Sequence, residues 1–294
     1  MKLAFVGLGA MGKHMALNLA ESGELLLVSA RTNRAFPEFE ERGIRTTTDP
    51  SEAAEADVIF LCLPDAAVVS DTVEKLKPML RAGQILVDCS TIKYQTVFRL
   101  EGELSALGVR FLDAPVSGLE SRAKDGTLTI MVGGDEKAFR TVLPYLERMG
   151  KNILYMGGPG SGQLAKLVNQ LLYDINMAAL AEIMPMAVKM GLDSEKITAV
   201  VNSGTGRSHA SEYFLPNILQ GSFHNSYPMQ SAYKDLVSAA EIGAELGVPM
   251  PVLAAATATY QQALLRGFGD CDKGGMIRVY EELLGVRFRA AEQD

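Results

Sequence analysis

The chain opens with Lys2-Leu3-Ala4-Phe5-Val6-Gly7-Leu8-Gly9-Ala10-Met11-Gly12. Leu3–Val6 is a short apolar run typical of a buried strand, and residues 13–22 have a helical pattern. A strand, a glycine turn and a helix start place backbone N–H groups and the positive end of a helix dipole where a pyrophosphate can lie. The turn between strand and helix therefore predicts a dinucleotide site.

Each glycine of this turn has a separate expected role. Gly7 permits the tight turn, Gly9 lets the backbone approach the phosphates, and Gly12 lets the helix pack close to the strand. We expect Ala10 and Met11, between these glycines, to share the contact with the cofactor. A lone GxGxxG pattern is a weak signal, but this one follows the first strand of an α/β pattern. The alternative is a glycine turn that holds no ligand.

Composition limits the class of protein. The chain has 294 residues, is 48% hydrophobic and carries a net charge of −7, so we expect two globular domains and no nucleic-acid binding through a basic surface. Its three cysteines form no CxxC and its three histidines no HExxH, so neither a disulfide framework nor a metal site is indicated. No apolar run reaches membrane-span length, and the first strand leaves no room for a signal peptide. We therefore expect a cytoplasmic protein without membrane contact.

The first half of the chain alternates strands with helices. Two of the helical patterns cover residues 94–107 and 136–149. Short apolar runs bounded by turns predict parallel strands covered on both faces, in a doubly wound sheet. After Gly108 the later strands are expected to extend this sheet in mixed orientation. The expected strands cover residues 3–6, 25–29, 58–63, 85–88, 109–113, 129–132 and 153–155.

The pattern changes after the loop Gly157-Gly158-Pro159-Gly160-Ser161-Gly162. Beyond it no convincing strand occurs, and a long helix is expected over residues 163–190. Pro185 is expected to kink or split that helix, and Gly191 to cap it. We predict a Rossmann-type NADP-binding domain at residues 1–161, and an all-helical domain for substrate binding and oligomerisation at 162–294, joined by the long helix. The other expected helices of the second domain cover residues 194–203, 233–246, 251–266 and 276–284.

The end of the second strand indicates the cofactor. NAD sites place an Asp or Glu about 20 residues past the glycines, on the ribose 2′-OH. Here the strand ends Val28-Ser29-Ala30-Arg31-Thr32, without a carboxylate. Arg31 and Thr32, with help from Arg34, would donate to a 2′-phosphate, which favours NADP(H) over NAD(H). The alternative is that Arg31 is a solvated loop arginine.

Two further strand ends should border the same crevice, because ligands of such sheets lie beyond the carboxyl ends of the strands. One is Leu61-Cys62-Leu63-Pro64-Asp65, and the other is Val87-Asp88-Cys89-Ser90-Thr91-Ile92. We expect Leu63, Pro64 and Thr91 to contact the cofactor near its nicotinamide and ribose. Small polar residues at such turns also serve as ordinary helix N-caps.

Candidate substrate residues follow in the middle of the chain. Ser117 and the N–H groups after it, including that of Gly118, are suited to a carboxylate, although an ordinary turn explains them equally well. Lys166 and Asn169 share a helix face among apolar neighbours and need either solvent or a polar cavity. A positioned ammonium can protonate a carbonyl oxygen as hydride arrives, and Asn169 can hydrogen-bond the substrate. The alternative for Lys166 is a snorkelling lysine.

Together these segments resemble the β-hydroxyacid dehydrogenase family, which includes 3-hydroxyisobutyrate dehydrogenases, tartronate semialdehyde reductases and succinic semialdehyde/glyoxylate reductases. The motifs span nearly the whole chain and occur in family order. They are Phe5 to Gly12, Asp88 to Ile92, Asp113-Ala114-Pro115-Val116-Ser117-Gly118, Gly126 to Gly134, the Gly162…Lys166…Asn169 helix start, and Lys234-Asp235-Leu236.

The resemblance implies roles for individual residues. It implies Lys166 as general acid/base, Ser117, Gly118 and Asn169 at the substrate, and Thr91 near the nicotinamide. It places Lys234 near cofactor or substrate, whereas an isolated Lys-Asp pair is more often surface charge. Arg31 and Thr32 resemble the Arg-Thr pair of the family's NADP-using branch. The resemblance also implies a small carboxylic-acid substrate and a homodimer or homotetramer.

The chain departs from the family pattern after Gly118. Leu119 and Arg122 stand where further glycines are expected. Because leucine does not readily adopt a positive φ, a different loop backbone is expected, which puts the usual carboxylate contact of the second glycine N–H in doubt. Arg122 either clamps a substrate carboxylate or points outward and pairs with Glu120 or Asp125.

The sequence thus predicts an NADP(H)-preferring oxidoreductase that interconverts a short hydroxy acid and its semialdehyde or keto acid, with a succinic semialdehyde/glyoxylate-type reduction favoured. One alternative is an imine reductase, which usually carries another proton donor at the Lys166 position. The other is a non-catalytic NADP-binding scaffold or sensor, against which the presence of Lys166 and Asn169 argues.

Overall fold

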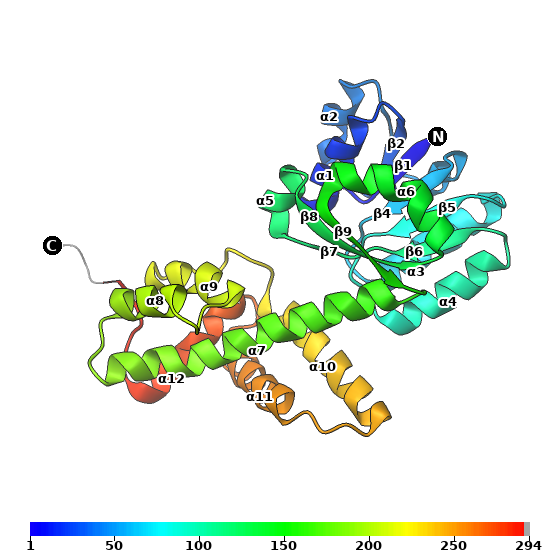
Figure 1. The fold of residues 1–294 in the computed structure, drawn as a ribbon. Coiled ribbons are helices and arrows are strands. Elements are labelled where there is room, and N and C mark those ends of the chain that lie inside the picture. Colours follow the sequence, from blue (N-terminus) through cyan, green and yellow to red (C-terminus); the bar gives the residue numbers. More distant parts are fainter. Residues whose placement is uncertain (291–294) are drawn as a thin grey trace. The chain divides into compact units, whose positions relative to one another are not determined.

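The computed structural model describes residues 1–290, and the chain divides into two compact units, Met1–Lys166 and Leu167–Asp294. The first unit contains a nine-stranded sheet with helices, and the described part of the second unit consists of helices (Figure 1). The fold is a Rossmann-like sheet unit followed by a helical unit, as the sequence predicts.

Six parallel strands form the main part of the sheet, in the order β3-β2-β1-β4-β5-β6. The order runs outward in both directions from β1 and β4, which is the doubly wound arrangement. All six carboxyl ends therefore meet along one edge of the sheet, and the predicted cofactor residues follow four of them. The bounds are β1 Leu3–Val6, β2 Leu25–Ser29, β3 Arg45–Thr47, β4 Val58–Leu61, β5 Ile85–Asp88 and β6 Arg110–Asp113.

The later strands confirm the expected mixed orientation. Strand β8 (Leu128–Gly134) runs antiparallel to β6 and to the short strand β7 (Val116–Ser117). Strand β9 (Gly150–Gly157) pairs in parallel with β8. The sequence did not reveal β3 or β7, because neither has the long apolar run that marked the other strands.

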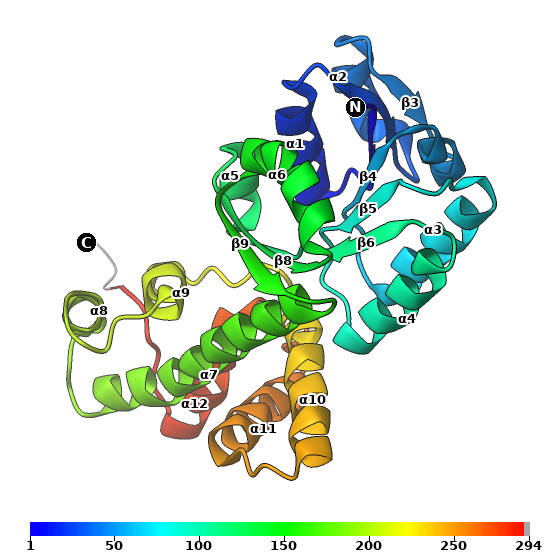
Figure 2. The ribbon, with the colours of Figure 1, turned by 45° about the vertical axis from the view of Figure 1, so that its right-hand side comes forward.

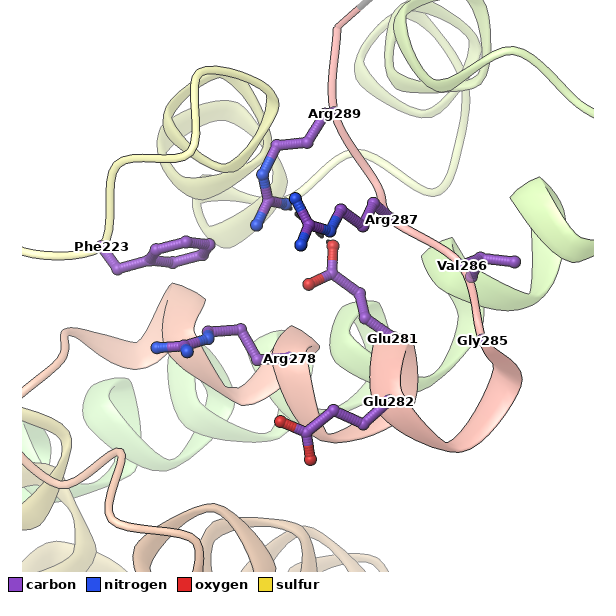
Figure 3. Close-up of a pocket in the computed structure, with 8 residues that line it drawn as sticks. All are labelled: Phe223, Arg278, Glu281, Glu282, Gly285, Val286, Arg287 and Arg289. Atoms are coloured by element: carbon purple, nitrogen blue, oxygen red, sulfur yellow. Dashed lines mark hydrogen bonds and ion pairs between the residues drawn. The ribbon is translucent and has the colours of Figure 1, made fainter.

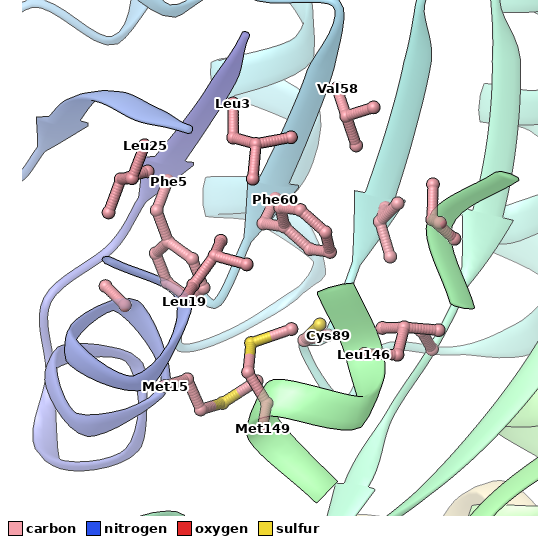
Figure 4. Close-up of a cluster of buried hydrophobic side chains, with 14 of the residues drawn as sticks. Leu3, Phe5, Met15, Leu19, Leu25, Val58, Phe60, Cys89, Leu146 and Met149 are labelled. Atoms are coloured by element: carbon pink, nitrogen blue, oxygen red, sulfur yellow. The ribbon is translucent and has the colours of Figure 1, made fainter. Parts of the chain in front are cut away.

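Helices cover both faces of the sheet, and alternate residues of β1 show the division. Leu3 and Phe5 pack in one buried cluster with helices α1 (Ala10–Ala20) and α6 (Glu136–Met149) (Figure 4). Ala4 and Val6 pack in another with α3 (Ala66–Leu76) and α4 (Tyr94–Ser105), on the opposite face (Figure 2). Burial on both faces explains why the strand sequences are continuously apolar. The remaining helices of this unit are α2 Phe36–Glu40 and α5 Leu119–Lys124, with short 3-10 turns at Asn33–Ala35, Pro50–Glu55 and Lys77–Met79.

The second unit contains the part of the long helix α7 (Ser161–Lys189) that follows Lys166. Its Met177, Ala181 and Met184 are buried in a core with aromatic side chains from other helices, such as Phe214 and Tyr260. The other elements are α8 Ser194–Ser203, α9 His209–Leu219, α10 Met229–Leu246, α11 Pro251–Leu265, a 3-10 turn at Lys273–Met276 and α12 Ile277–Leu284.

The structure changes two expectations about α7. Of the two effects expected of Pro185, a split does not occur, because the helix continues to Lys189. Helix α7 also proves long and apolar enough to cross a membrane by length and composition, although no such run was expected. A core helix of a soluble protein passes the same test, and α7 buries part of its surface in the core just described. Gly191 follows the helix with a φ of +91°, as expected of its cap.

Candidate cofactor and substrate site

The turn between β1 and α1 requires glycine at two positions. Gly7 has a φ of +104°, and a Cβ on it would lie 2.2 Å from the carbonyl oxygen of Cys62. A Cβ on Gly12 would lie 2.0 Å from the carbonyl oxygen of Gly7, so the helix packs directly on the turn. The Gly7 N–H donates to the carbonyl of Ser29 at 2.8 Å, which holds the turn beside the end of β2. Both glycines thus have the structural roles that the sequence predicted for them.

Gly9 differs from Gly7 and Gly12, because a side chain at this position would meet open space. No protein atom outside its immediate chain neighbours lies within 4 Å of a Cβ built there. As the N-cap of α1, Gly9 offers the helix no side-chain acceptor, and the first turn carries no acidic residue. An open approach to uncapped N–H groups at a positive helix end fits the pyrophosphate of a dinucleotide.

The segment after β2 carries cations without carboxylates beside them. Arg31, Thr32 and Arg34 are all exposed. Among residues 1–290, no ion pair includes either arginine, and the first acidic side chain after β2, Glu38, pairs with Lys13. Both guanidinium groups are therefore available to an anion near the end of β2.

The ends of β4 and β5 are tied together by Ser90. The N–H of Leu63 donates to the Ser90 hydroxyl at 2.8 Å, and the N–H of Ser90 donates to the carboxylate of Asp88 at 3.0 Å. Pro64 and Thr91, on either side of this contact, are exposed at the same edge of the sheet. The structure therefore brings together the predicted cofactor residues of the first unit, which follow β1, β2, β4 and β5.

Two fully buried carboxyl groups lie at this edge. Asp88 and Asp113 face one another across β5 and β6. Burial raises the pKa of Asp88 to about 7 and that of Asp113 to about 6. Burial also raises the pKa of the nearby Cys62 thiol to about 12, which disfavours its thiolate form.

Asp113 holds the start of α7. One of its carboxylate oxygens accepts the Gly160 N–H and the other accepts the Gln163 N–H, each at 2.8 Å. The Gln163 side chain accepts from the Ile92 N–H at 3.1 Å and donates to the Ser90 carbonyl at 2.7 Å. Three residues further along the helix, Lys166 is only 8% exposed. Sequence analysis assigned no role to Asp113 or Gln163, since their partners are distant in the chain.

The loop after β7 keeps a glycine-like backbone despite its leucine. Leu119 has a φ of +60°, the left-handed conformation that the sequence analysis did not expect of it. The expectation that leucine would avoid a positive φ at this position is therefore wrong. For a residue with a Cβ this conformation costs about 1–2 kcal/mol.

Arg122 packs against this loop. Its guanidinium donates to the carbonyl of Thr127, and its side chain lies so close to Gly118 that a Cβ there would be 2.8 Å from the Cβ of Arg122. Among the residues described, it pairs with neither Glu120 nor Asp125; Glu120 approaches His14 instead, at 3.3 Å. Ser117, at the end of β7, is half-buried.

The remaining predicted residues, Asn169 and Lys234, belong to the second unit. Asn169 follows Lys166 by three positions in α7, and so shares a face with it, and is exposed. Lys234 is exposed in α10, and none of the ion pairs within residues 1–290 includes it. One turn beyond Lys166, Gln170 donates to the Tyr227 hydroxyl at 2.7 Å.

The second unit also has a surface hollow of about 690 Å³ beside α12 (Figure 3). Two of its three arginines contact other side chains of the protein: Arg289 pairs with Glu281 at 2.8 Å, and Arg278 lies 4.2 Å from the ring centre of Phe268. None of the predicted site residues lines it. The lining residues are Phe223, Arg278, Glu281, Glu282, Gly285, Val286, Arg287 and Arg289.

In the described part of the chain, no cluster of three or more His, Cys, Asp or Glu is arranged to hold a metal.

Comparison with known proteins identifies the family of both parts of the chain. Residues 2–157 match the family model described as the NAD binding domain of 6-phosphogluconate dehydrogenase. Residues 160–280 match the model described as NAD-binding of NADP-dependent 3-hydroxyisobutyrate dehydrogenase. The fold and the glycine turn, with these matches, define a dehydrogenase or reductase that binds a nicotinamide dinucleotide.

Individual proteins that resemble this chain are dehydrogenases or reductases of small hydroxy acids. The chain is 35% identical to 2-(hydroxymethyl)glutarate dehydrogenase from Eubacterium barkeri, over 97% of this chain and 96% of that protein. It is 32% identical to 2-hydroxy-3-oxopropionate reductase from Escherichia coli, over 96% and 97% of the two chains. The crystal structure of a 3-hydroxyisobutyrate dehydrogenase from Salmonella typhimurium matches with a TM-score of 0.86 at 26% identity, covering 95% of this chain and 99% of that one. The chain belongs to the β-hydroxyacid dehydrogenase family.

Proposed function

We propose that the protein is an NADP(H)-preferring oxidoreductase that interconverts a short hydroxy acid and its semialdehyde or keto acid, with Lys166 as general acid/base. The observation that carries this proposal is the placement of Lys166. It is nearly buried in a helix whose first turn is bonded to the ends of β5 and β6, the edge where a dinucleotide binds in such sheets. An ammonium group placed at that edge can transfer a proton to or from the oxygen of a bound substrate.

The proton step follows from the chemistry of the ammonium group. The bound nicotinamide supplies or accepts the hydride at the substrate carbon. In the reducing direction Lys166 gives a proton to the carbonyl oxygen, and in the oxidising direction its amine takes the proton of the hydroxyl group. We assign Asn169, on the same helix face, a hydrogen bond to the substrate, and we assign Thr91 and Lys234 to the nicotinamide side of the site.

The cofactor preference rests on the end of β2. Arg31, Thr32 and Arg34 offer donors to a 2′-phosphate, and no carboxylate lies where an NAD site needs one. The match of the second half to the model of NADP-dependent 3-hydroxyisobutyrate dehydrogenase agrees with this preference. NAD(H) remains the weaker cofactor in this proposal.

We place the substrate carboxylate at Ser117 and Gly118. Arg122 lies against Gly118 and uses one of its nitrogens on Thr127, so its other N–H groups can bind a second acidic group. The relative that acts on a glutarate has a dicarboxylic substrate, which favours a dicarboxylic semialdehyde such as succinic semialdehyde here. Arg122→Ala should then raise the KM for succinic semialdehyde, while the Kd of NADPH stays unchanged. If the KM of Arg122→Ala equals the wild-type KM for every acid that the enzyme accepts, Arg122 has a purely structural role.

We also propose self-association as a homodimer or homotetramer. Val168, Leu172 and Ile183 of α7, and Met190 directly after the helix, are large apolar side chains that are 53–74% exposed. Light scattering coupled to size-exclusion chromatography should give a mass of two or four chains, and a monomer at micromolar concentration would contradict the proposal.

The function is tested by NADPH oxidation with succinic semialdehyde, glyoxylate, tartronate semialdehyde and a cyclic imine. We expect turnover with at least one of the acids, and faster turnover with NADPH than with NADH. Turnover with the imine alone would identify an imine reductase, and NADPH binding without any turnover would identify a scaffold or sensor.

A further inference from the structure

Asp113 and Gln163 form a buried connection between the sheet and the first turn of α7. Asp113 is fully buried at the end of β6 and accepts two backbone N–H groups from residues 47 and 50 positions later in the chain. The contact is tightly packed, because a Cβ on Gly133 would lie 2.5 Å from the Asp113 carboxylate and one on Gly162 would lie 2.9 Å from it. Asp113 therefore has little freedom to move, and neither has the turn it holds.

Gln163 fixes the same turn to the end of β5. Its side chain bonds the Ser90 carbonyl and the Ile92 N–H, which are the two backbone groups on either side of Thr91. Thr91 is itself exposed at the cofactor edge. One side chain thus sets the distance between the Thr91 backbone and a helix on which Lys166 follows three residues later.

We propose that Asp113 and Gln163 are positioning residues for the proton transfer: they fix the first turn of α7 on the ends of β5 and β6, and through it the ammonium group of Lys166. This inference rests on the proposed role of Lys166. It assigns both residues to the chemical step. Asp113 contacts neither the glycine turn nor the end of β2, whereas Gln163 also holds the Thr91 segment on the nicotinamide side.

The size of the effect follows from the bonds involved. In Asp113→Asn one carboxylate oxygen becomes an NH₂ group, so either the Gly160 or the Gln163 N–H faces another donor and the turn must shift. A displacement of about 1 Å at a reacting group can cost about 100-fold in rate. We expect kcat to fall roughly 10- to 100-fold, while the Kd of NADPH changes less than about twofold.

The experiment compares Asp113→Asn with Asp135→Asn. Asp135 caps α6 by accepting the Ala138 N–H at 2.8 Å, and α6 carries no predicted site residue. Both variants remove a helix-capping charge from the first unit, so both are expected to lower Tm. Only Asp113→Asn is expected to lower kcat per active site, with a larger kinetic isotope effect from NADPH that carries deuterium at the transferred position.

Gln163→Met is the second variant, and it tests the positioning role if Asp113→Asn does not fold. Methionine keeps the length of the side chain and removes both bonds to the Thr91 segment, so kcat should fall about tenfold or more. A wild-type kcat in folded Asp113→Asn, or in Gln163→Met if the former is unfolded, would overturn the inference.

Lys166→Met distinguishes a failure of the positioning role from a failure of the proposed role of Lys166. If Lys166→Met loses turnover while the Asp113 and Gln163 variants keep it, the positioning role fails and the proposed function stands. If Lys166→Met keeps wild-type turnover, the role of Lys166 itself is wrong, and the positioning role is overturned with it.

Discussion

Replacing Arg31 with alanine tests how the protein chooses its cofactor. The guanidinium lies two residues past the end of β2, is exposed, and has no ion-pair partner within the described residues, so an NADPH 2′-phosphate would be its principal anion. A hydrogen bond between charged groups contributes about 1.5–3 kcal/mol. Because this arginine is open to solvent and salt, we expect the lower end of that range, or roughly a tenfold weaker Kd for NADPH.

The matched control is Arg110→Ala. Arg110 is also exposed, but it begins β6 and so lies at the opposite edge of the parallel sheet. Calorimetric titration should show that Arg31→Ala weakens NADPH and leaves NADH nearly unchanged, whereas Arg110→Ala affects neither. Equal losses for both cofactors in Arg31→Ala, or a wild-type preference for NADH, would refute the reasoning from the missing carboxylate.

Three further results are expected. Gly12→Ala should lower the free energy of unfolding by about 1–3 kcal/mol or more, because the added Cβ would clash with the backbone. Gly9→Ala should keep the wild-type Tm and weaken NADPH binding, because its side-chain position is open. The reverse pattern would contradict the roles assigned to the two glycines. Leu119→Ile should lower Tm more than Leu119→Gly, because a β-branched residue is strained at a φ of +60°, and an equal loss would argue against that strain. Burial raises the pKa of Asp88 from 3.8 to about 7, so the stability that its protonated form contributes is lost as pH rises through that interval. The Tm of Asp88→Asn minus that of the wild type should therefore increase between about pH 5 and pH 8, and a constant difference would contradict the burial argument.

Much of the sheet unit could be predicted from the sequence, because local chemistry determines it. Buried parallel strands are continuously apolar, and the glycine pattern specifies a turn whose geometry involves only residues close in sequence. Helix α6 was predicted with its observed bounds, since Asp135 caps it and Gly150 follows it. Strands β3 and β7 were missed because they are short and carry no long apolar run. Helix α9 was missed although Ala210, Phe214 and Ile218 recur at helical spacing and are buried.

The substrate side of the site was less predictable, because it depends on contacts between distant residues. Asp113 accepts hydrogen bonds from the backbone N–H groups of residues 47 and 50 positions later, and no local sequence pattern predicts such a partner. Leu119 was mispredicted for another reason: its residue type argues against a positive φ, yet its φ is +60° in the folded chain. The partner of Arg122 is a backbone carbonyl, which sequence analysis of charged pairs does not consider.

The most direct measurement is the turnover of Lys166→Met with the best substrate, together with its Kd for NADPH. Removing a general acid should lower kcat by roughly 10²–10⁴-fold. The Kd of NADPH should stay near the wild-type value, because the glycine turn and the end of β2 hold the cofactor. Near-normal turnover in a folded Lys166→Met protein would contradict the account.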